Sequence, residues 1–127
     1  MLIMRLEDED GYGPWKNEAI YTVDLPTGRG EEAVHDMYNN DFYPSAWSRT
    51  EFNNDFFCGV RSVFQLQYWF SDTVLSQFAK LGIKLNLYEV PENHVQVIDY
   101  QVVFPKKAAS LVRSILPHEY HIFEKDA

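Results

Sequence analysis

Cysteine is almost absent from this chain, and long apolar runs are missing altogether. Cys58 is the only cysteine among 127 residues, which excludes a disulfide within the chain and a metal site built from four cysteines. No apolar run approaches the roughly 20 residues that a membrane helix requires. The start of the chain turns acidic too soon to be a signal peptide. We therefore expect a soluble protein of the reducing cytoplasm with no membrane partner.

Basic residues are scarce in the first sixty positions. This half contains four Lys and Arg against twelve Asp and Glu, a net charge of -8, whereas residues 61–127 contain seven of each sign. It also holds ten of the twenty aromatic residues. An acidic, aromatic surface is complementary to a basic protein groove and repels phosphate, which argues against direct nucleic-acid binding. The alternative is that the charge serves solubility alone.

The hydrophobic pattern predicts a single α+β domain over residues 1–127. An apolar content of 46% excludes a wholly disordered chain, and at this length folding buries roughly two thirds of the surface. Apolar runs and period-two alternation predict strands at 2–6, 19–23, 83–87, 95–98 and 101–104, the last two forming one strand region broken by a kink or bulge at 99–100. Helical spacing predicts helices at 31–38, 62–70, 73–81 and 106–116. We expect a mainly antiparallel sheet with three or four short helices.

Cap and turn residues mark the boundaries of these elements. Ser62 can cap the start of the helix at 62–70, and Gly82 suits the left-handed position after the helix at 73–81. Residues 39–57 are predicted to be mainly loop, with an Asx-type turn at each of the two Asn-Asn-Asp-Phe copies. The tail at 118–127 is polar and is expected to be frayed.

The predicted core combines the apolar faces of these elements. Leu87 continues the alternating strand and Leu111 lies on the predicted final helix, so both are expected to be buried. The aromatics predicted to join them are Trp69, Phe70, Phe78 and Phe104. A second aromatic group lies in predicted loops beside carboxylates, where it suits either an interface or anchoring of the loops to the core. This group comprises Trp15, Tyr38, Tyr43 and Trp47.

Motifs for chemistry are incomplete. His118 and His121 have helical metal-ligand spacing, but only two carboxylates accompany them, so we expect no metal site. Cys58 could form a thiolate pair with His35 or His94, yet its apolar neighbours favour a buried structural thiol. The pair of glycines at 11 and 13 lacks the third glycine of a phosphate loop. We expect no catalytic residue, metal or cofactor.

Four blocks together resemble a known group of proteins. They are Gly59-Val-Arg-Ser62, residues 66–70, the Leu-Asn-Leu-Tyr-Glu-Val-Pro of 85–91, and Gln101-Val-Val-Phe104. Together the four blocks cover about residues 57–113, and this region resembles the C-terminal half of small uncharacterised proteins encoded by phages and prophages. The resemblance implies an accessory phage protein acting in the host cytoplasm, for which host takeover and inhibition of host immunity are the usual roles. It implies no catalytic residue.

The same block is similar in order to the ADP-ribosyltransferase fold. That similarity implies a nicotinamide site at Arg5, Ser62 and either Asp99 or Gln101. The chain departs from the family pattern because it lacks a Ser-Thr-Ser element and a Glu-x-Glu pair, and the missing carboxylate would stabilise the developing charge on ribose. An ADP-ribosyltransferase-like enzyme, or an inactive NAD-binding relative, is therefore the alternative function.

These observations favour a binding protein. The hypothesis is that the chain binds and inhibits a host protein related to defence, in the manner of an anti-CRISPR protein, by occupying a basic surface that normally binds nucleic acid. Carboxylates would stand in for phosphates, and aromatics would form the desolvated centre of the contact. The predicted partner-binding residues are Glu7, Asp8, Glu9, Asp10, Trp15, Glu31, Glu32, Asp36, Asp41, Tyr43, Trp47 and Asp55.

Overall fold

The structure of the protein is a computed structural model that describes residues 1–13, 55–98 and 100–124. The strand predicted at 19–23, the helix predicted at 31–38 and all but the end of the loop predicted at 39–57 lie outside these ranges. The described elements alternate between strands and short helices, and every strand pairing is antiparallel. The predicted α+β class with mainly antiparallel pairing is confirmed.

The first sheet has the strand order β1-β3-β6, with β3 in the middle. Strand β1 spans Leu2–Glu7, β3 spans Lys84–Glu89 and β6 spans Ser110–Ile115. Leu85 and Leu87 of β3 are buried while Lys84 is exposed, which confirms the alternation read from the sequence. In the register of β1 with β3, Leu2 lies opposite Glu89 and Glu7 lies opposite Lys84.

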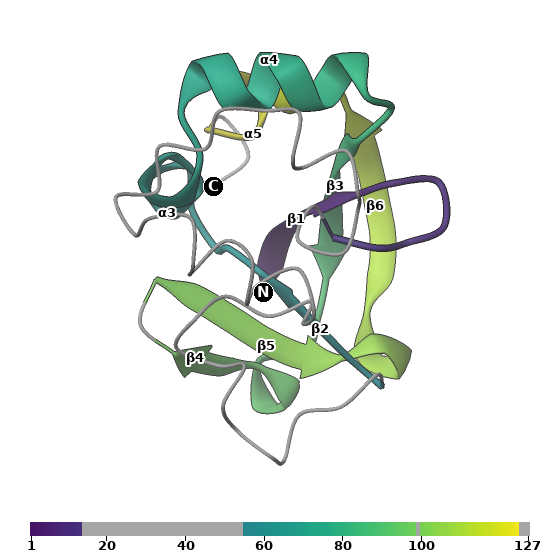
Figure 1. The fold of residues 1–127 in the computed structure, drawn as a ribbon. Helices are drawn as coiled ribbons and strands as arrows, with labels where there is room; N and C mark the ends of the chain where they lie inside the picture. Colours follow the sequence, from purple (N-terminus) through teal and green to yellow (C-terminus); the bar gives the residue numbers. More distant parts are fainter. Residues whose placement is uncertain (14–54, 99, 125–127) are drawn as a thin grey trace, which may run out of the picture.

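The second sheet has the strand order β2-β5-β4. Strand β2 spans Phe56–Gly59, β4 spans Gln96–Ile98 and β5 spans Gln101–Pro105. The predicted single strand region with a kink or bulge at 99–100 is wrong, because β4 and β5 are two strands that pair antiparallel with Ile98 opposite Gln101. Figure 1 shows this sheet on the opposite side of the molecule from α4.

A backbone bridge joins β1 of the first sheet to Val60, the residue that follows β2 of the second. The amide of Met4 in β1 donates to the carbonyl of Val60 at 2.7 Å, and the amide of Val60 donates back to Met4 at 2.8 Å. Gly59 permits this approach, because a Cβ at that position would lie 2.6 Å from the carbonyl oxygen of Met4. The glycine beside the bridge therefore lets β2 pass directly against β1.

Two helices follow the bridge, and each begins with a serine cap, of which Ser62 was predicted. Helix α3 spans Val63–Trp69, and the Ser62 hydroxyl accepts from the amide of Gln65; α4 spans Asp72–Lys80, capped in the same way by Ser71. After α4, Gly82 has a φ of 82°, the left-handed conformation predicted for it. Among the described residues, no helix is long and apolar enough to cross a membrane.

Residues 117–124 pack against these helices instead of fraying. The 3₁₀ helix η5 spans Pro117–Glu119, α5 spans His121–Glu124, and Tyr120 and Phe123 are buried. The Tyr120 hydroxyl accepts from the Gln67 side chain and donates to the Asp72 carboxylate at 2.6 Å. Our expectation of a frayed tail is therefore wrong for residues 118–124, because two aromatic side chains in a polar stretch suffice to anchor it.

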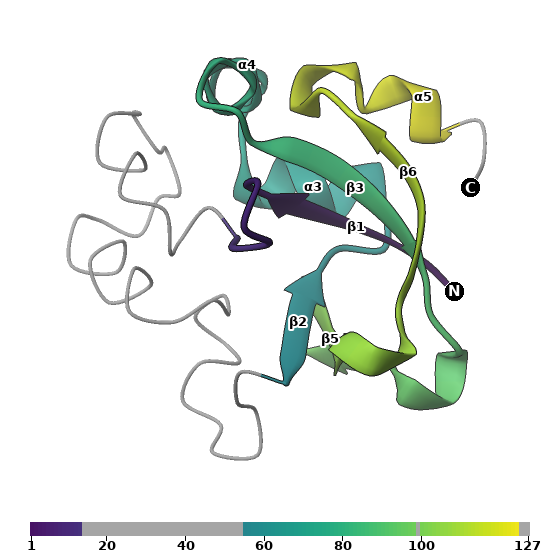
Figure 2. The same cartoon turned by 90° about the vertical axis from the view of Figure 1, so that its right-hand side faces the viewer.

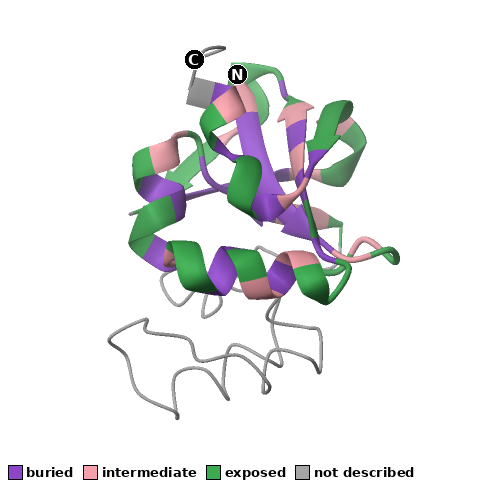
Figure 3. Cartoon of the chain, turned by 90° about the horizontal axis from the view of Figure 1, so that it is seen from above, coloured by how far each residue is buried: buried purple, intermediate pink, exposed green. Residues whose placement is uncertain are grey.

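The core lies between the first sheet and the helices, and a smaller cluster lies over the second sheet. Figure 3 shows how buried and exposed residues alternate along the helices. All four aromatics predicted for the core are buried, as is Leu87. Leu111 was placed wrongly, since it is 58% exposed on β6. The predicted helix at 106–116 is instead the 3₁₀ helix η4, Lys106–Ala108, followed by β6, because pairing with β3 overrides a helical spacing that local propensity supports only weakly.

Candidate partner-binding surface

The acidic turn, residues 8–12, follows β1 and has a well-defined backbone. One oxygen of the Asp8 carboxylate accepts from the amides of Asp10 at 2.9 Å and Tyr12 at 3.0 Å. The amide of Asp8 donates to the Tyr12 carbonyl at 2.9 Å, and Gly11 has a φ of 84°. Glu9, Asp10 and Tyr12 are exposed. Asp8 thus organises a turn that presents two carboxylates and a tyrosine ring to solvent.

Arg5 fixes this turn to the body of the protein. Its guanidinium donates to the carbonyl of Gly11 at 3.1 Å and to the carbonyl of Cys58 at 2.9 Å, and it lies 4.0 Å from the centre of the Phe57 ring. One buried side chain therefore connects β1, the acidic turn and β2. The position of the turn is set by the same residue that holds the two sheets together.

Glu7 belongs to this buried cluster and not to the surface on which the sequence placed it. Its side chain is only 5% exposed, and its carboxylate lies 3.7 Å from Nε of Arg5. It accepts hydrogen bonds from the Asn86 amide at 2.9 Å and from the Tyr88 hydroxyl. Burial, followed by the Glu7 carboxylate, raises the pKa of Tyr88 well above its usual value. Because β1 continues through Glu7 to pair with β3, this carboxylate faces polar groups of the fold.

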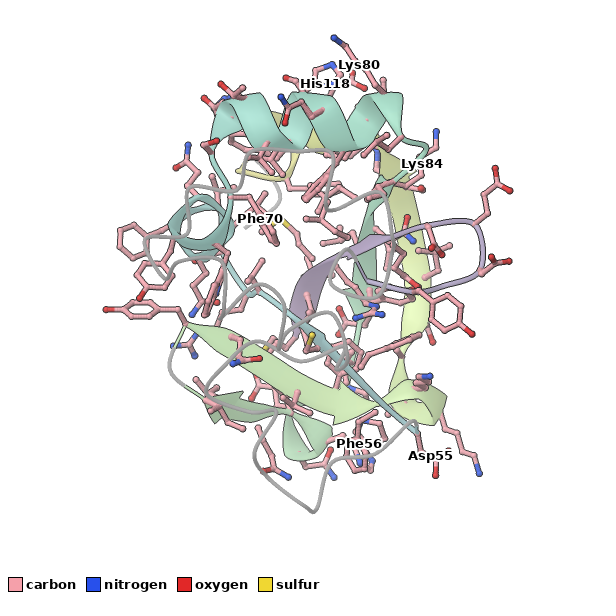
Figure 4. The ribbon with its side chains drawn as sticks, viewed as in Figure 1. Asp55, Phe56, Phe70, Lys80, Lys84 and His118 are labelled. Carbon is pink, nitrogen blue, oxygen red and sulfur yellow. The ribbon has the colours of Figure 1, made fainter. Side chains whose placement is uncertain are left out.

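The other predicted contact residues divide between the described and undescribed parts of the chain. Asp55 is exposed and immediately precedes β2, where it is labelled in Figure 4. The remaining predicted residues lie outside the described residues: Trp15, Glu31, Glu32, Asp36, Asp41, Tyr43 and Trp47. Within the described ranges, the predicted surface is therefore the acidic turn together with Asp55.

The candidate chemical groups are dispersed. Cys58 is buried, as predicted. His118 lies in η5 and His121 begins α5, and no group of three or more potential metal-ligating side chains occurs in the described ranges. Of the residues matched to a nicotinamide site, Arg5 and Gln101 are buried and Ser62 caps α3, while Asp99 is not described.

An aromatic surface that the sequence did not reveal lies beside α3. Tyr68 stacks on Tyr100 of the β4–β5 hairpin with ring centres 3.9 Å apart, and Phe64, one helical turn earlier, is 70% exposed. The indole of Trp69 donates to the Tyr100 carbonyl at 2.8 Å and fixes the hairpin to the helix. Apolar side chains project from all sides of this seven-residue helix, and a helix that packs on one face cannot bury all of them. This excess of apolar residues is the sequence signal that could have predicted an exposed aromatic surface.

One comparison with known proteins gives a match. The sequence model of the family described as bacteriophage T4 Y00F protein matches residues 1–118. No curated protein matches the chain significantly, and no solved structure does. None of these comparisons supports the similarity to ADP-ribosyltransferases.

Proposed function

Since the chain belongs to the bacteriophage T4 Y00F protein family, we propose that it is an accessory phage protein that binds and inhibits a host protein in the host cytoplasm. The proposed target is a defence-related protein, and the proposed contact is its basic surface for nucleic acid. The family match supports a phage protein, and the acidic turn supports the mode of binding.

The acidic turn is the observation that carries the proposal. Its carboxylates are exposed on a backbone held by Asp8 and by Arg5, so little conformational entropy is lost when they meet a partner. Tyr12, 52% exposed beside them, adds an amphipathic ring of the kind enriched at the centres of interfaces. The acidic residues of positions 14–54 add to the negative charge of the chain, which would speed association with a basic groove.

The test compares two double charge reversals in the full chain. Host proteins captured on the wild-type protein are identified, and the binder is purified for titration. Glu9→Lys with Asp10→Lys should weaken binding at least about tenfold, because each close charge pair in an interface contributes on the order of 1.5 kcal/mol or more. Glu92→Lys with Glu119→Lys reverses the same charge at exposed positions outside the turn. This control should change affinity by less than about twofold, because salt screens charges that lie far from the contact.

Competition with nucleic acid then tests the proposed mode of inhibition. The wild-type protein should displace the host protein's own nucleic acid, and raising the salt concentration should slow association. Equal affinities for the two double variants would remove the acidic turn from the mechanism. A ternary complex that retains the nucleic acid would show that the protein binds elsewhere on its target.

A further inference from the structure

The outer edge of β6 is the long side of the first sheet that faces away from β3. Among the described strands, β6 pairs with β3 alone. Residues 110–114 are all exposed, including Leu111 at 58% and Val112 at 56%. In Figure 2 β6 runs along one side of this sheet. A six-residue strand with this exposure offers backbone donors, acceptors and apolar side chains to a second strand.

The charge around this edge is opposite to that of the rest of the chain. Residues 100–118 contain Lys106, Lys107 and Arg113 and no acidic residue, although the whole chain has a net charge of -8. Lys107 and Arg113 are exposed, and neither takes part in an ion pair within the described ranges. The nearest acid on β3 is Glu89, opposite Ser110, and it binds the N-terminal ammonium at 3.1 Å.

The pairing of β6 with β3 is irregular at the same point. Leu87 lies opposite Arg113 and Tyr88 opposite Leu111, so Val112 is an extra residue in a bulge. Bulges and charges commonly protect sheet edges from unwanted pairing. Here, however, the bulge leaves two adjacent apolar side chains in solvent between basic residues. This pattern favours an edge that accepts a strand of matching chemistry over an edge that prevents all pairing.

We propose that the outer edge of β6 binds an extended acidic segment of a partner protein by strand addition. The backbone of the segment would hydrogen-bond along β6, its apolar side chains would cover Leu111 and Val112, and its carboxylates would pair with Lys107 and Arg113. This surface differs in sign and position from the acidic turn. The inference therefore goes beyond the proposed function and does not depend on it.

The experiment uses a synthetic probe of the proposed chemistry. An acetylated, amidated peptide of four Val-Glu repeats is titrated into the full-length protein and followed by backbone amide shifts. Binding should localise to residues 107–114, and the matching Val-Lys peptide should bind at least tenfold more weakly. Two further Val-Glu peptides carry N-methyl groups on every valine or on every glutamate, which removes donors from one edge of the strand at a time. At least one of them should lose binding.

Variants of the protein separate this edge from general electrostatics. Lys107→Glu with Arg113→Glu should weaken the Val-Glu peptide at least tenfold, whereas Arg61→Glu with Lys80→Glu, also exposed, should leave it within twofold. Thermal melts of both variants should show a cooperative transition close to that of the wild type. Equal binding of both N-methylated peptides and the parent would overturn strand addition in favour of charge alone. Three other results would overturn the proposal as a whole. They are absence of Val-Glu binding, preferential binding of single-stranded DNA at the edge, and a dimer of the protein that Arg113→Glu dissociates.

Discussion

The two outer strands of the first sheet face very different surroundings. Strand β1 is buried from Ile3 to Glu7, whereas β6 is exposed from Ser110 to Ser114. Both pair with β3, so the contrast arises on their other sides: β1 meets Val60 and the buried Arg5 cluster, and β6 meets solvent. Position at the edge of a sheet therefore does not decide whether a strand is buried or exposed. What covers the strand decides it.

The largest difference in the free energy of unfolding should come from replacing one arginine on each outer strand by alanine. Arg5→Ala removes one partner of a buried ion pair and leaves Glu7 with a buried charge, which typically costs about 3 to 5 kcal/mol. Arg113→Ala removes an exposed side chain from β6 and should change the free energy of unfolding by less than about 0.5 kcal/mol. Denaturant titration of both variants measures this. Similar losses would break the comparison.

Two leucines test the same contrast between covered and exposed positions: Leu87 lies on β3 and Leu111 on β6. Leu87→Ala opens a cavity in the core and should cost about 2 to 5 kcal/mol. Leu111→Ala, at 58% exposure, should stay within about 0.5 kcal/mol of the wild type. Thermal melts of the pair provide the measurement. A loss at Leu111 comparable with that at Leu87 would mean that another part of the protein covers β6 in solution.

A smaller effect is expected where β2 passes against β1. Gly59→Ala places a methyl group 2.6 Å from the Met4 carbonyl oxygen, so the backbone bridge must shift, at a cost of about 1 to 3 kcal/mol. Ser114→Ala on the exposed strand is the matched control and should be nearly neutral. Denaturant midpoints would distinguish them, and a neutral Gly59→Ala would show that the two sheets separate more easily than this contact implies.

The smallest effect concerns Tyr88, which lies on β3 between the two outer strands. The pKa of Tyr88 is raised in the folded protein, so its protonated hydroxyl stabilises the fold. This contribution to the free energy of unfolding is fully present below the unfolded pKa of about 10 and is lost as the pH rises toward the folded pKa. Tyr88→Phe should be less stable near neutral pH, since Glu7 loses a hydrogen bond, but its stability should fall less steeply above pH about 10. Parallel slopes for variant and wild type would contradict this.

The sequence predicted most of the elements whose signal is local. Serine caps, a glycine after α4 and period-two alternation each act within a few residues, and those elements formed as predicted. It failed at β6, where helical spacing of apolar residues competes with pairing to a strand more than twenty residues away. It also failed at Glu7. An acidic run reads as a solvated loop, and only the fold brings Arg5, Asn86 and Tyr88 around its first carboxylate.

The candidate site was predictable in composition but not in geometry. Glu9 and Asp10 are exposed as the charge pattern suggested, yet the hydrogen bond from Arg5 to Gly11 that fixes their turn has no signature in sequence. The stacking of Tyr68 on Tyr100 likewise depends on a hairpin that was read as a kink. Contacts between distant segments decide which side chains are presented to a partner.

Amide hydrogen exchange, recorded with and without the Val-Glu peptide, tests the contrast between the two strands most directly. We predict slow exchange in β1 under both conditions, since its opening requires breaking the bridge to Val60. In β6 we predict fast exchange at alternate amides in the protein alone and slower exchange at those amides once the peptide binds. Slow exchange throughout β6 in the protein alone, or no change with peptide, would contradict the account.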